Sequence, residues 1–237
     1  MLEILTGGSP GASFNPIPIL GYNFDQNKST SGADATVVTG GTIVDIGAGS
    51  PLTGYSKALR LLNVGATFNQ TAALTQLGYQ DYTFEGWFWF STIPSNYQTV
   101  ILLSWASQDI CIQFGDQGFG FRLQSSMYAR GGTGYNYNTP QTSQGMTGKW
   151  YHFAMVRKSG KVRFYVDGVH QMFASGTTMT YPLEEYNGAY NLTGNVTTRA
   201  LGGAYRTPTD MYIPEVALFI GAKYVKDFTP PVGPLVK

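Results

Sequence analysis

The sequence predicts an all-β protein, a sandwich or barrel of short antiparallel strands, on three observations. Aromatic residues make up 14% of the 237 residues, charged residues only 12%, and 30 residues are glycine, which favours strands joined by turns. Apolar residues recur with period two rather than 3.6, so long helices are not expected. Turn residues separate these runs about every 8–12 residues, which is typical of β-sandwiches and barrels.

Charge and cysteine content exclude several classes of protein. There are 15 basic and 14 acidic residues, so neither a nucleic-acid-binding surface nor an acidic disordered tail is expected. The single cysteine, Cys111, excludes an intramolecular disulfide and CxxC zinc sites. The N-terminus lacks the pattern of a signal peptide, and the longest apolar stretches fall short of the roughly 20 residues that span a bilayer. We therefore expect no export signal, no membrane partner and no nucleic-acid partner.

Residues 1–22 differ in composition from the rest of the chain. They hold one charged residue and are spaced by prolines and glycines, which makes a poor independent domain but suits an extended arm that lies on another protein. A frayed terminus is the alternative. The apolar residues that would dock this arm are Ile4, Leu5, Phe14, Ile17, Ile19 and Leu20. We expect the β-domain to cover residues 23–231 and a tail to cover 232–237, because the prolines near residue 230 cannot lie inside a sheet.

The strand signals become regular after residue 22. Residues 57–64 are predicted to form a strand, followed by residues 82–90. In this second strand large aromatic side chains lie on both faces: Tyr82, Phe84, Phe88 and Phe90 on one, Trp87 and Trp89 on the other. Such a pattern predicts a central strand with both faces covered. Further strands are predicted at residues 99–106, 110–114, 119–124 and 216–220.

Two hairpins are predicted in the second half of the chain. Residues 150–157 and 162–166 flank a tight turn that contains Gly160. Residues 162–166 and 169–173 flank Asp167-Gly168, a pair that favours a type I′ turn because both central residues need a positive φ.

The segments at residues 125–146 and 177–198 are predicted to be long loops rich in Tyr, Asn, Gly and Thr. Long ordered loops on a β scaffold commonly carry binding sites. Carbohydrate binding needs aromatic rings beside amides and hydroxyls, and the loops offer these in Tyr128, Tyr135, Asn136, Tyr137, Asn138, Tyr186, Asn187, Tyr190 and Asn191. The same tyrosines would equally suit packing over strand ends or a subunit interface, and this alternative stays open.

Catalytic motifs are weak in this sequence. Asp81 and Glu85 come nearest to a glycosidase pattern, in which two carboxylates face the sugar from one strand, but Thr83 stands between them. His152 lies in a predicted core strand, where we expect it to be packed and hydrogen-bonded. The chain has no Gly-x-Ser-x-Gly elbow and no phosphate-binding loop. No enzymatic activity is therefore expected.

Calcium is an open possibility for which no ligand is assigned. The ion needs six to eight oxygen ligands, usually with several carboxylates. The acidic residues that two converging loops could bring together are isolated in the sequence: Asp109, Asp116, Asp167 and Asp210.

The order of the strand-like runs resembles the concanavalin A-like, laminin-G-like jelly-roll family. The runs that carry the resemblance lie at residues 57–64, 81–90 (Asp-Tyr-Thr-Phe-Glu-Gly-Trp-Phe-Trp-Phe), 148–157 (Gly-Lys-Trp-Tyr-His-Phe-Ala-Met-Val-Arg), 162–169 and 214–231. The resemblance covers about residues 22–231. It implies two antiparallel sheets of about six or seven strands each, packed face to face.

The resemblance also implies a function, because similar domains occur in bacterial and tailed-phage proteins such as capsid decorations, fibres and tail components. We expect a non-enzymatic structural protein of the virion surface, a homo-oligomer that docks through its arm on capsid or tail proteins and gains strength from many copies. The alternative is a lectin-like adhesin that holds cell-surface polysaccharide in host attachment, and a glycoside hydrolase ranks third. The fold by itself does not choose between them.

Overall fold

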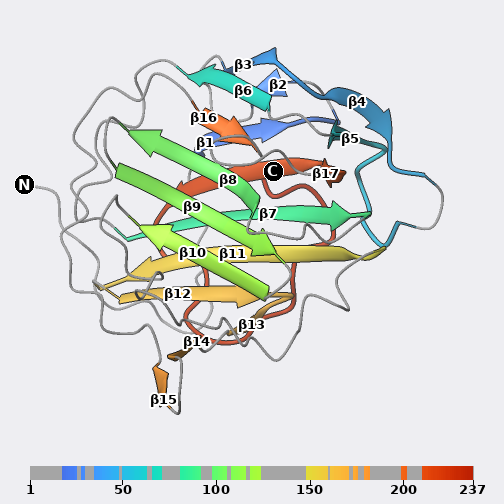
Figure 1. Cartoon of the computed structure of the whole chain (residues 1–237). Coiled ribbons are helices and arrows are strands. Elements are labelled where there is room, and N and C mark those ends of the chain that lie inside the picture. Colours follow the sequence, from blue (N-terminus) through green and yellow to red (C-terminus); the bar gives the residue numbers. More distant parts are fainter. Residues whose placement is uncertain are drawn as a thin grey trace, which may run out of the picture.

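The computed structural model describes residues 18–25, 28–29, 35–47, 50–62, 66–70, 81–91, 98–105, 108–115, 118–123, 148–159, 161–170, 173–175, 179–181, 199–201 and 210–236. Every regular element in these ranges is a β-strand, and two antiparallel sheets lie face to face (Figure 1). The predicted all-β jelly-roll sandwich is thus confirmed. No helix in the described ranges has the length and apolar character needed to cross a membrane.

The larger sheet, which we call sheet A, has ten strands in the described part of the chain. They are β1 (Pro18–Asn23), β2 (Lys28–Ser29), β4 (Thr42–Asp45), β5 (Lys57–Leu61), β7 (Tyr82–Phe90), β11 (Trp150–Lys158), β12 (Lys161–Val166), β13 (Val169–His170), β17 (Met211–Ile213) and β18 (Glu215–Ile220). Strand β7 is central. On one side β7 pairs with β11. On the other side its first part, from Tyr82 to Gly86, pairs with β18, and its end, at Trp89 and Phe90, pairs with β17.

The smaller sheet, sheet B, crosses in front of sheet A in Figure 1. Its described strands are β3 (Ala35–Thr39), β6 (Ala66–Gln70), β8 (Gln98–Trp105), β9 (Gln108–Gly115), β10 (Gly118–Leu123) and β16 (Arg199–Leu201). A separate hairpin is formed by β14 (Phe173–Ser175) and β15 (Met179–Tyr181). The strands predicted at residues 99–106, 110–114 and 119–124 correspond to β8, β9 and β10.

Both predicted hairpins form. Strands β11 and β12 pair up to Lys158 and Lys161, and Ser159 in their turn has a φ of 49°. In the turn between β12 and β13, Asp167 and Gly168 have φ values of 50° and 77°, as a type I′ turn requires. Strand β13 is shorter than predicted.

The inner face of sheet A forms the aromatic core between the sheets. Phe88, Phe153 and Phe164 come from β7, β11 and β12 and are fully buried. Their ring centroids are 5.3 Å apart from Phe88 to Phe153 and 5.9 Å apart from Phe153 to Phe164. Close packing of such rings contributes beyond the area they bury.

Strand β1 corrects the predicted boundary of the arm. It begins at Pro18 and pairs along β18, where Gly21 faces Ala217 and Tyr22 faces Val216. The main chain of Ile19 and Leu20, which the sequence assigns to the docking arm, therefore belongs to a strand of the domain's own sheet. The boundary at residue 22 is wrong because β18 offers a sheet edge that this segment fills. Ile4, Leu5, Phe14 and Ile17 lie outside the described residues.

The outer face of sheet A is covered by the C-terminal segment, residues 221–236. Trp87 of β7 donates a hydrogen bond from its Nε1 to the carbonyl of Pro231, at 2.9 Å, and packs in a buried cluster with Leu52, Tyr55 and Leu235. The prediction that both faces of β7 are covered is confirmed. The predicted tail at 232–237 is wrong for its described part, because Leu235 is 7% exposed and its backbone N–H donates to the carboxylate of Glu215, at 2.8 Å.

A buried carboxylate anchors this covering segment. Glu85 of β7 is fully buried. It accepts hydrogen bonds from Lys223 Nζ and Tyr224 OH of the C-terminal segment, the latter at 2.8 Å, and lies 3.1 Å from His152 Nε2. Burial alone would raise the pKa of the Glu85 carboxyl, but the hydrogen bond and charge of His152 and the charge of Lys223 outweigh burial and lower the pKa.

Replacing Glu85 by Gln should destabilise the protein by about 3 kcal/mol at neutral pH, because Lys223 would lose its buried partner. The pKa of Glu85 is lower in the folded than in the unfolded chain. Its ionisation therefore stabilises the fold above the unfolded pKa of about 4.3, and this contribution is lost as the pH falls through the folded-state pKa. Urea unfolding between pH 7 and pH 2 should show a shallower acid decline for the variant than for the wild type.

The matched control is Glu215→Gln. Burial raises the pKa of the Glu215 carboxyl, although hydrogen bonds from Tyr55 and Leu235 oppose the rise. A neutral amide oxygen can still accept those bonds, so this variant should lose less stability at neutral pH and keep the wild-type decline below pH 4. Equal losses in the two variants would contradict the role assigned to Glu85.

Removing β1 should destabilise the domain. We expect a chain that begins at residue 24 to melt at least about 5 °C below one that begins at residue 18, because it lacks the ladder to β18 and the buried Tyr22 and Asn23. Differential scanning calorimetry of the two truncated chains measures the difference. Identical melting temperatures would show that β1 contributes nothing to the fold.

Candidate functional site

The loop residues that the sequence singles out for carbohydrate binding lie outside the described residues. This holds for Tyr128, Tyr135, Asn136, Tyr137, Asn138, Tyr186, Asn187, Tyr190 and Asn191. Their role stays a prediction.

The one carboxylate pair with near-glycosidase spacing serves structural contacts. Asp81 Oδ1 accepts a hydrogen bond from the backbone N–H of Ser159 at 2.7 Å, and its Oδ2 forms an ion pair with Lys158 at 3.0 Å. Glu85 is sealed beneath the C-terminal segment, with Lys223 and Tyr224 as partners. His152 is fully buried against Glu85, as predicted.

The acidic residues considered for calcium do not converge where the structure describes them. Asp167 accepts a hydrogen bond from the backbone N–H of His152 at 2.9 Å, and Asp210 is paired with Arg60. Asp116 and the side chain of Asp109 lie outside the description. Within the described ranges no three side chains of the types that ligate metals come together.

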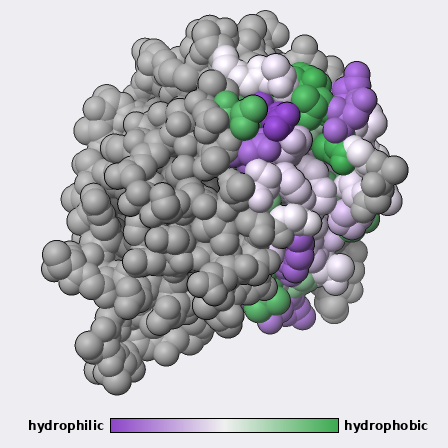
Figure 2. All heavy atoms as spheres, turned by 45° about the vertical axis from the view of Figure 1, so that its right-hand side comes forward, coloured by the Kyte–Doolittle hydropathy of each residue, from purple (hydrophilic) through white to green (hydrophobic). Residues whose placement is uncertain are grey.

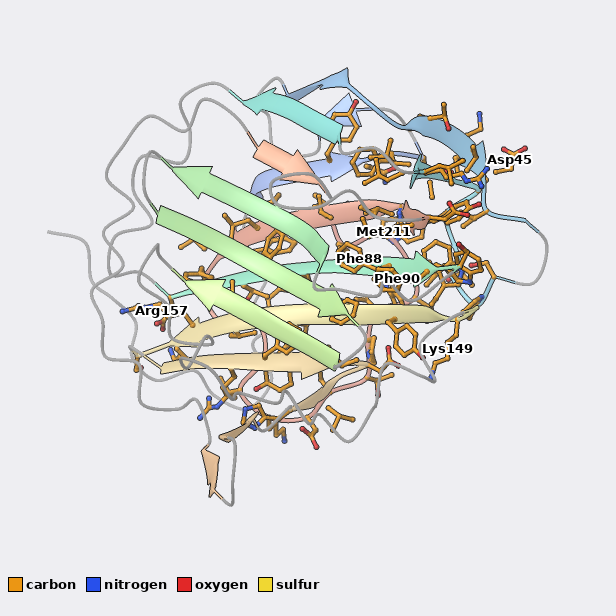
Figure 3. The ribbon with its side chains drawn as sticks, in the orientation of Figure 1. Asp45, Phe88, Phe90, Lys149, Arg157 and Met211 are labelled. Atoms are coloured by element: carbon orange, nitrogen blue, oxygen red, sulfur yellow. The ribbon has the colours of Figure 1, made fainter. Side chains whose placement is uncertain are left out.

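A pocket of about 640 Å³ opens at one end of sheet A. It lies where β7 and β11 meet the loop after β4, at the right-hand end of the molecule in Figure 3 and far from Arg157. The lining residues with charged, hydroxyl or aromatic side chains are Asp45, Ser50, Trp89, Lys149, Trp150 and Tyr212. In Figure 2, which turns this end forward, hydrophilic, intermediate and hydrophobic residues alternate, so this face is no continuous apolar patch.

Strand register places three aromatic side chains in a row along this pocket. Trp89 of β7 faces Trp150 of β11 on one side and Tyr212 of β17 on the other, and residues paired in this way point to the same face of the sheet. The rings of Trp89 and Tyr212 are 4.9 Å apart and nearly perpendicular. All three side chains are half-buried, so each keeps a surface that a ligand can contact.

An ion pair between Arg60 and Asp210 lies beside the pocket and packs against the Tyr212 ring. Arg60 donates two hydrogen bonds to the carboxylate of Asp210, at 2.8 and 3.0 Å, and its guanidinium lies 5.4 Å from the centre of the Tyr212 ring. The bonds to Asp210 raise the pKa of Arg60. Burial and the charge of Asp210 raise the pKa of Tyr212, which keeps its hydroxyl neutral. The ring is thus held in one place.

Backbone geometry keeps the pocket open. Gly47 and Gly148 have φ values of 77° and 73°, which residues with a Cβ rarely adopt. Among the described residues, and apart from the adjacent ones in the chain, no atom lies within 4 Å of where a Cβ of either glycine would stand. The backbone N–H of Gly148 donates to the carbonyl of Phe90 at 2.9 Å, which fixes this turn against the end of β7.

Sequence reasoning missed this row because it depends on pairing between distant strands. The alternation in residues 82–90 correctly placed Trp89 on the face opposite Phe88 and Phe90, and a strand was predicted from Trp150. Tyr212 comes from a segment that was not predicted to be a strand. The signal available in the sequence was a tryptophan near one end of each of two predicted strands: Trp89 near the end of residues 82–90, and Trp150 at the start of residues 150–157.

Comparison with known proteins places the fold. The family model of the concanavalin A-like lectin/glucanase superfamily matches residues 64–223. A comparison with curated proteins found no match. Domain 4 of AbnA, a GH43 extracellular arabinanase from Geobacillus stearothermophilus solved with arabinotriose, has a TM-score of 0.59 and 20% identity and covers 88% of this chain and 95% of its own.

Two solved toxin domains are also similar. The binding domain of botulinum neurotoxin serotype D has a TM-score of 0.60 and 17% identity, with 89% of this chain and 49% of that chain covered. The serotype D ligand-binding domain in complex with N-acetylneuraminic acid has a TM-score of 0.58 at the same identity. The chain thus spans about half the length of these toxin domains. At such identities the likeness concerns the fold, whereas the family match covers more than half of the sequence. The chain belongs to the concanavalin A-like lectin/glucanase superfamily.

Proposed function

We propose that this chain is a non-catalytic carbohydrate-binding domain and that the pocket at the end of sheet A holds a saccharide. One observation carries the proposal: Trp150, Trp89 and Tyr212 form a row of half-buried aromatic rings along a pocket that also holds carboxylate and hydroxyl groups. Its volume of about 640 Å³ lies in the range usual for small-ligand sites, roughly 300–1,000 Å³.

The arrangement suits the two kinds of surface that a sugar ring presents. Its C–H faces can pack on the aromatic rings, and its hydroxyls can exchange hydrogen bonds with polar groups at the rim. The indole N–H groups of Trp89 and Trp150 have no hydrogen-bond acceptor among the described residues, so both can donate to a ligand. Ser50 Oγ accepts from the backbone N–H of Leu52 at 3.2 Å and keeps its own proton available.

The positions of the described carboxylates agree with binding without hydrolysis. Glycoside hydrolysis needs two carboxyl groups on either side of the scissile bond, and Asp45 is the one carboxylate among the described residues that line the pocket. Glu85 and Asp81 are engaged in structural contacts. The arabinanase domain, solved with arabinotriose, and the toxin domain, solved with N-acetylneuraminic acid, are similar folds with saccharide ligands, which supports the proposal.

A place on a phage virion surface, with capsid or tail proteins and sister copies as partners, stays a prediction from family resemblance. We rank the carbohydrate role ahead of it because the chain belongs to a lectin/glucanase superfamily and similar domains were solved with saccharides. The two roles are compatible, since a decoration or tail protein that holds host polysaccharide would gain avidity from many copies.

Substitutions in the aromatic row should weaken saccharide binding. We expect Trp89→Ala and Tyr212→Ala to raise the Kd for a saccharide found on a glycan array by at least tenfold, equivalent to about 1.4 kcal/mol. Tyr212→Phe, which keeps the ring, should lose less. Isothermal titration calorimetry measures these constants, and circular dichroism checks that each variant is folded.

The matched control is a double substitution of tyrosines in the predicted loop, Tyr135→Ala with Tyr137→Ala. If this variant loses binding while the pocket variants keep it, the site lies in the loop and the proposal for the pocket is wrong. Intrinsic fluorescence gives a second test that needs no variant, because a ligand that contacts Trp89 and Trp150 should change the tryptophan emission in a saturable way.

A further inference from the structure

We propose that the pocket selects uncharged saccharides, and that Asp45 both binds their hydroxyls and repels acidic sugars. The inference rests on the proposed function and adds the class of ligand. It stands on one juxtaposition: a carboxylate with no hydrogen bond or ion pair among the described residues lies at the pocket rim, while two nearby cations, Arg60 and Lys149, form ion pairs with other carboxylates.

Asp45 is free to contact a ligand. It is the last residue of β4, is exposed and lines the pocket. No hydrogen bond or ion pair joins its carboxylate to another side chain in the described part of the chain. Lys57 stands opposite Asp45 in the ladder, but no ion pair between its ammonium and Asp45 is found within the described residues. The carboxylate is therefore exposed and without a direct contact there, so a ligand can reach it.

Arg60 cannot offer a second charge to an acidic ligand without breaking an existing pair. Two hydrogen bonds, at 2.8 and 3.0 Å, join its guanidinium to Asp210. This two-point arrangement is the strongest form of such a pair. A ligand carboxylate would have to displace Asp210 from Arg60, and the contact between the Arg60 guanidinium and the Tyr212 ring would be lost as well.

Lys149 is turned away from the aromatic row. Its Nζ lies 4.8 Å from the centre of the Tyr151 ring and 3.7 Å from Asp167 Oδ2. Tyr151 points to the face of β11 opposite Trp150, because adjacent residues of a strand alternate between faces. Figure 3 shows Asp45 beside β4 and Lys149 beside β11, well separated at the same end of the molecule.

The chemistry of these groups favours neutral ligands. An ionised carboxylate is an acceptor only, and its two oxygens can take the protons of two neighbouring sugar hydroxyls. A ligand carboxylate in the same place would bring two like charges together, and among the described residues no cation is in direct contact with Asp45; such a clash is a common source of specificity. This would set the chain apart from the similar toxin domain solved with N-acetylneuraminic acid, an acidic sugar.

The experiment compares matched pairs of oligosaccharides that differ at one group, such as galactose and galacturonic acid oligomers or glucose and glucuronic acid oligomers. The full chain should bind the neutral member of a recognised pair at least tenfold more tightly. In Asp45→Asn the ratio should fall below about threefold, and the wild-type ratio should shrink with added salt, because salt screens charge repulsion at exposed sites.

Each outcome has a distinct meaning. Preference for the acidic member, or an unchanged ratio in Asp45→Asn, overturns the inference while the pocket remains a saccharide site. Loss of acidic-sugar binding in Lys149→Gln would show that Lys149 holds a ligand carboxylate and would also overturn it. If neither member of any pair binds, or if Trp89→Ala and Tyr212→Ala bind as the wild type does, the proposed function fails and the inference fails with it.

Discussion

The structure depends on a constraint set by β7, which carries large aromatic side chains on both faces and must be covered on both. Sheet B covers the face of Phe84 and Phe88. Among the described strands no second sheet covers the face of Trp87. The C-terminal segment, whose prolines keep it out of any ladder, lies across that face instead. A segment without strand pairing must satisfy its polar groups by other means. The carbonyl of Pro231 does so with the Trp87 indole.

The pocket lies where the C-terminal segment stops covering the outer face of sheet A. Along the outer face of β7, Thr83 and Glu85 are fully buried and Trp87 is 6% exposed, whereas Trp89 is only half-buried. The C-terminal segment packs over the first three residues and leaves the last one beside open space. One alternating strand thus supplies a sealed core at one end and, at the other, the exposed aromatic surface that we propose as the saccharide site.

Features set by neighbouring residues could be predicted from the sequence, and those set by distant partners could not. The turn at Asp167-Gly168 was predictable because its conformation depends on the pair itself. Coverage of both faces of β7 was predictable because alternation shows which side chains share a face. Strand β1 was missed because its evidence lies in β18, almost two hundred residues away, and Leu235 was missed because proline density excludes a strand but not a packed covering segment.

The pocket could not be predicted from the sequence either, because its aromatic residues come from strands that are far apart in the chain. Trp89 and Trp150 are both visible in the sequence, but they are neighbours only because β7 and β11 pair in one register, and Tyr212 joins them through a third strand. The sequence favours the tyrosine-rich loops as a binding site because loops commonly carry such sites, and this stays a prediction. The aromatic row at the pocket lies on paired strands, which hold the rings more rigidly than a loop would and so would reduce the entropy that binding must overcome.

Carboxylates on this sheet have different roles because their surroundings differ. Glu85 is buried but keeps a lowered pKa, because His152 and Lys223 compensate its charge. Glu215 has a raised pKa because burial outweighs the hydrogen bonds that it accepts from Tyr55 and from the Leu235 N–H. Asp45 is exposed at the pocket rim and has no partner among the described residues. The shifted pKa values of Glu85 and Glu215 therefore mark how the covering segment is attached, whereas the carboxylate best placed to meet the proposed ligand makes no such structural contact.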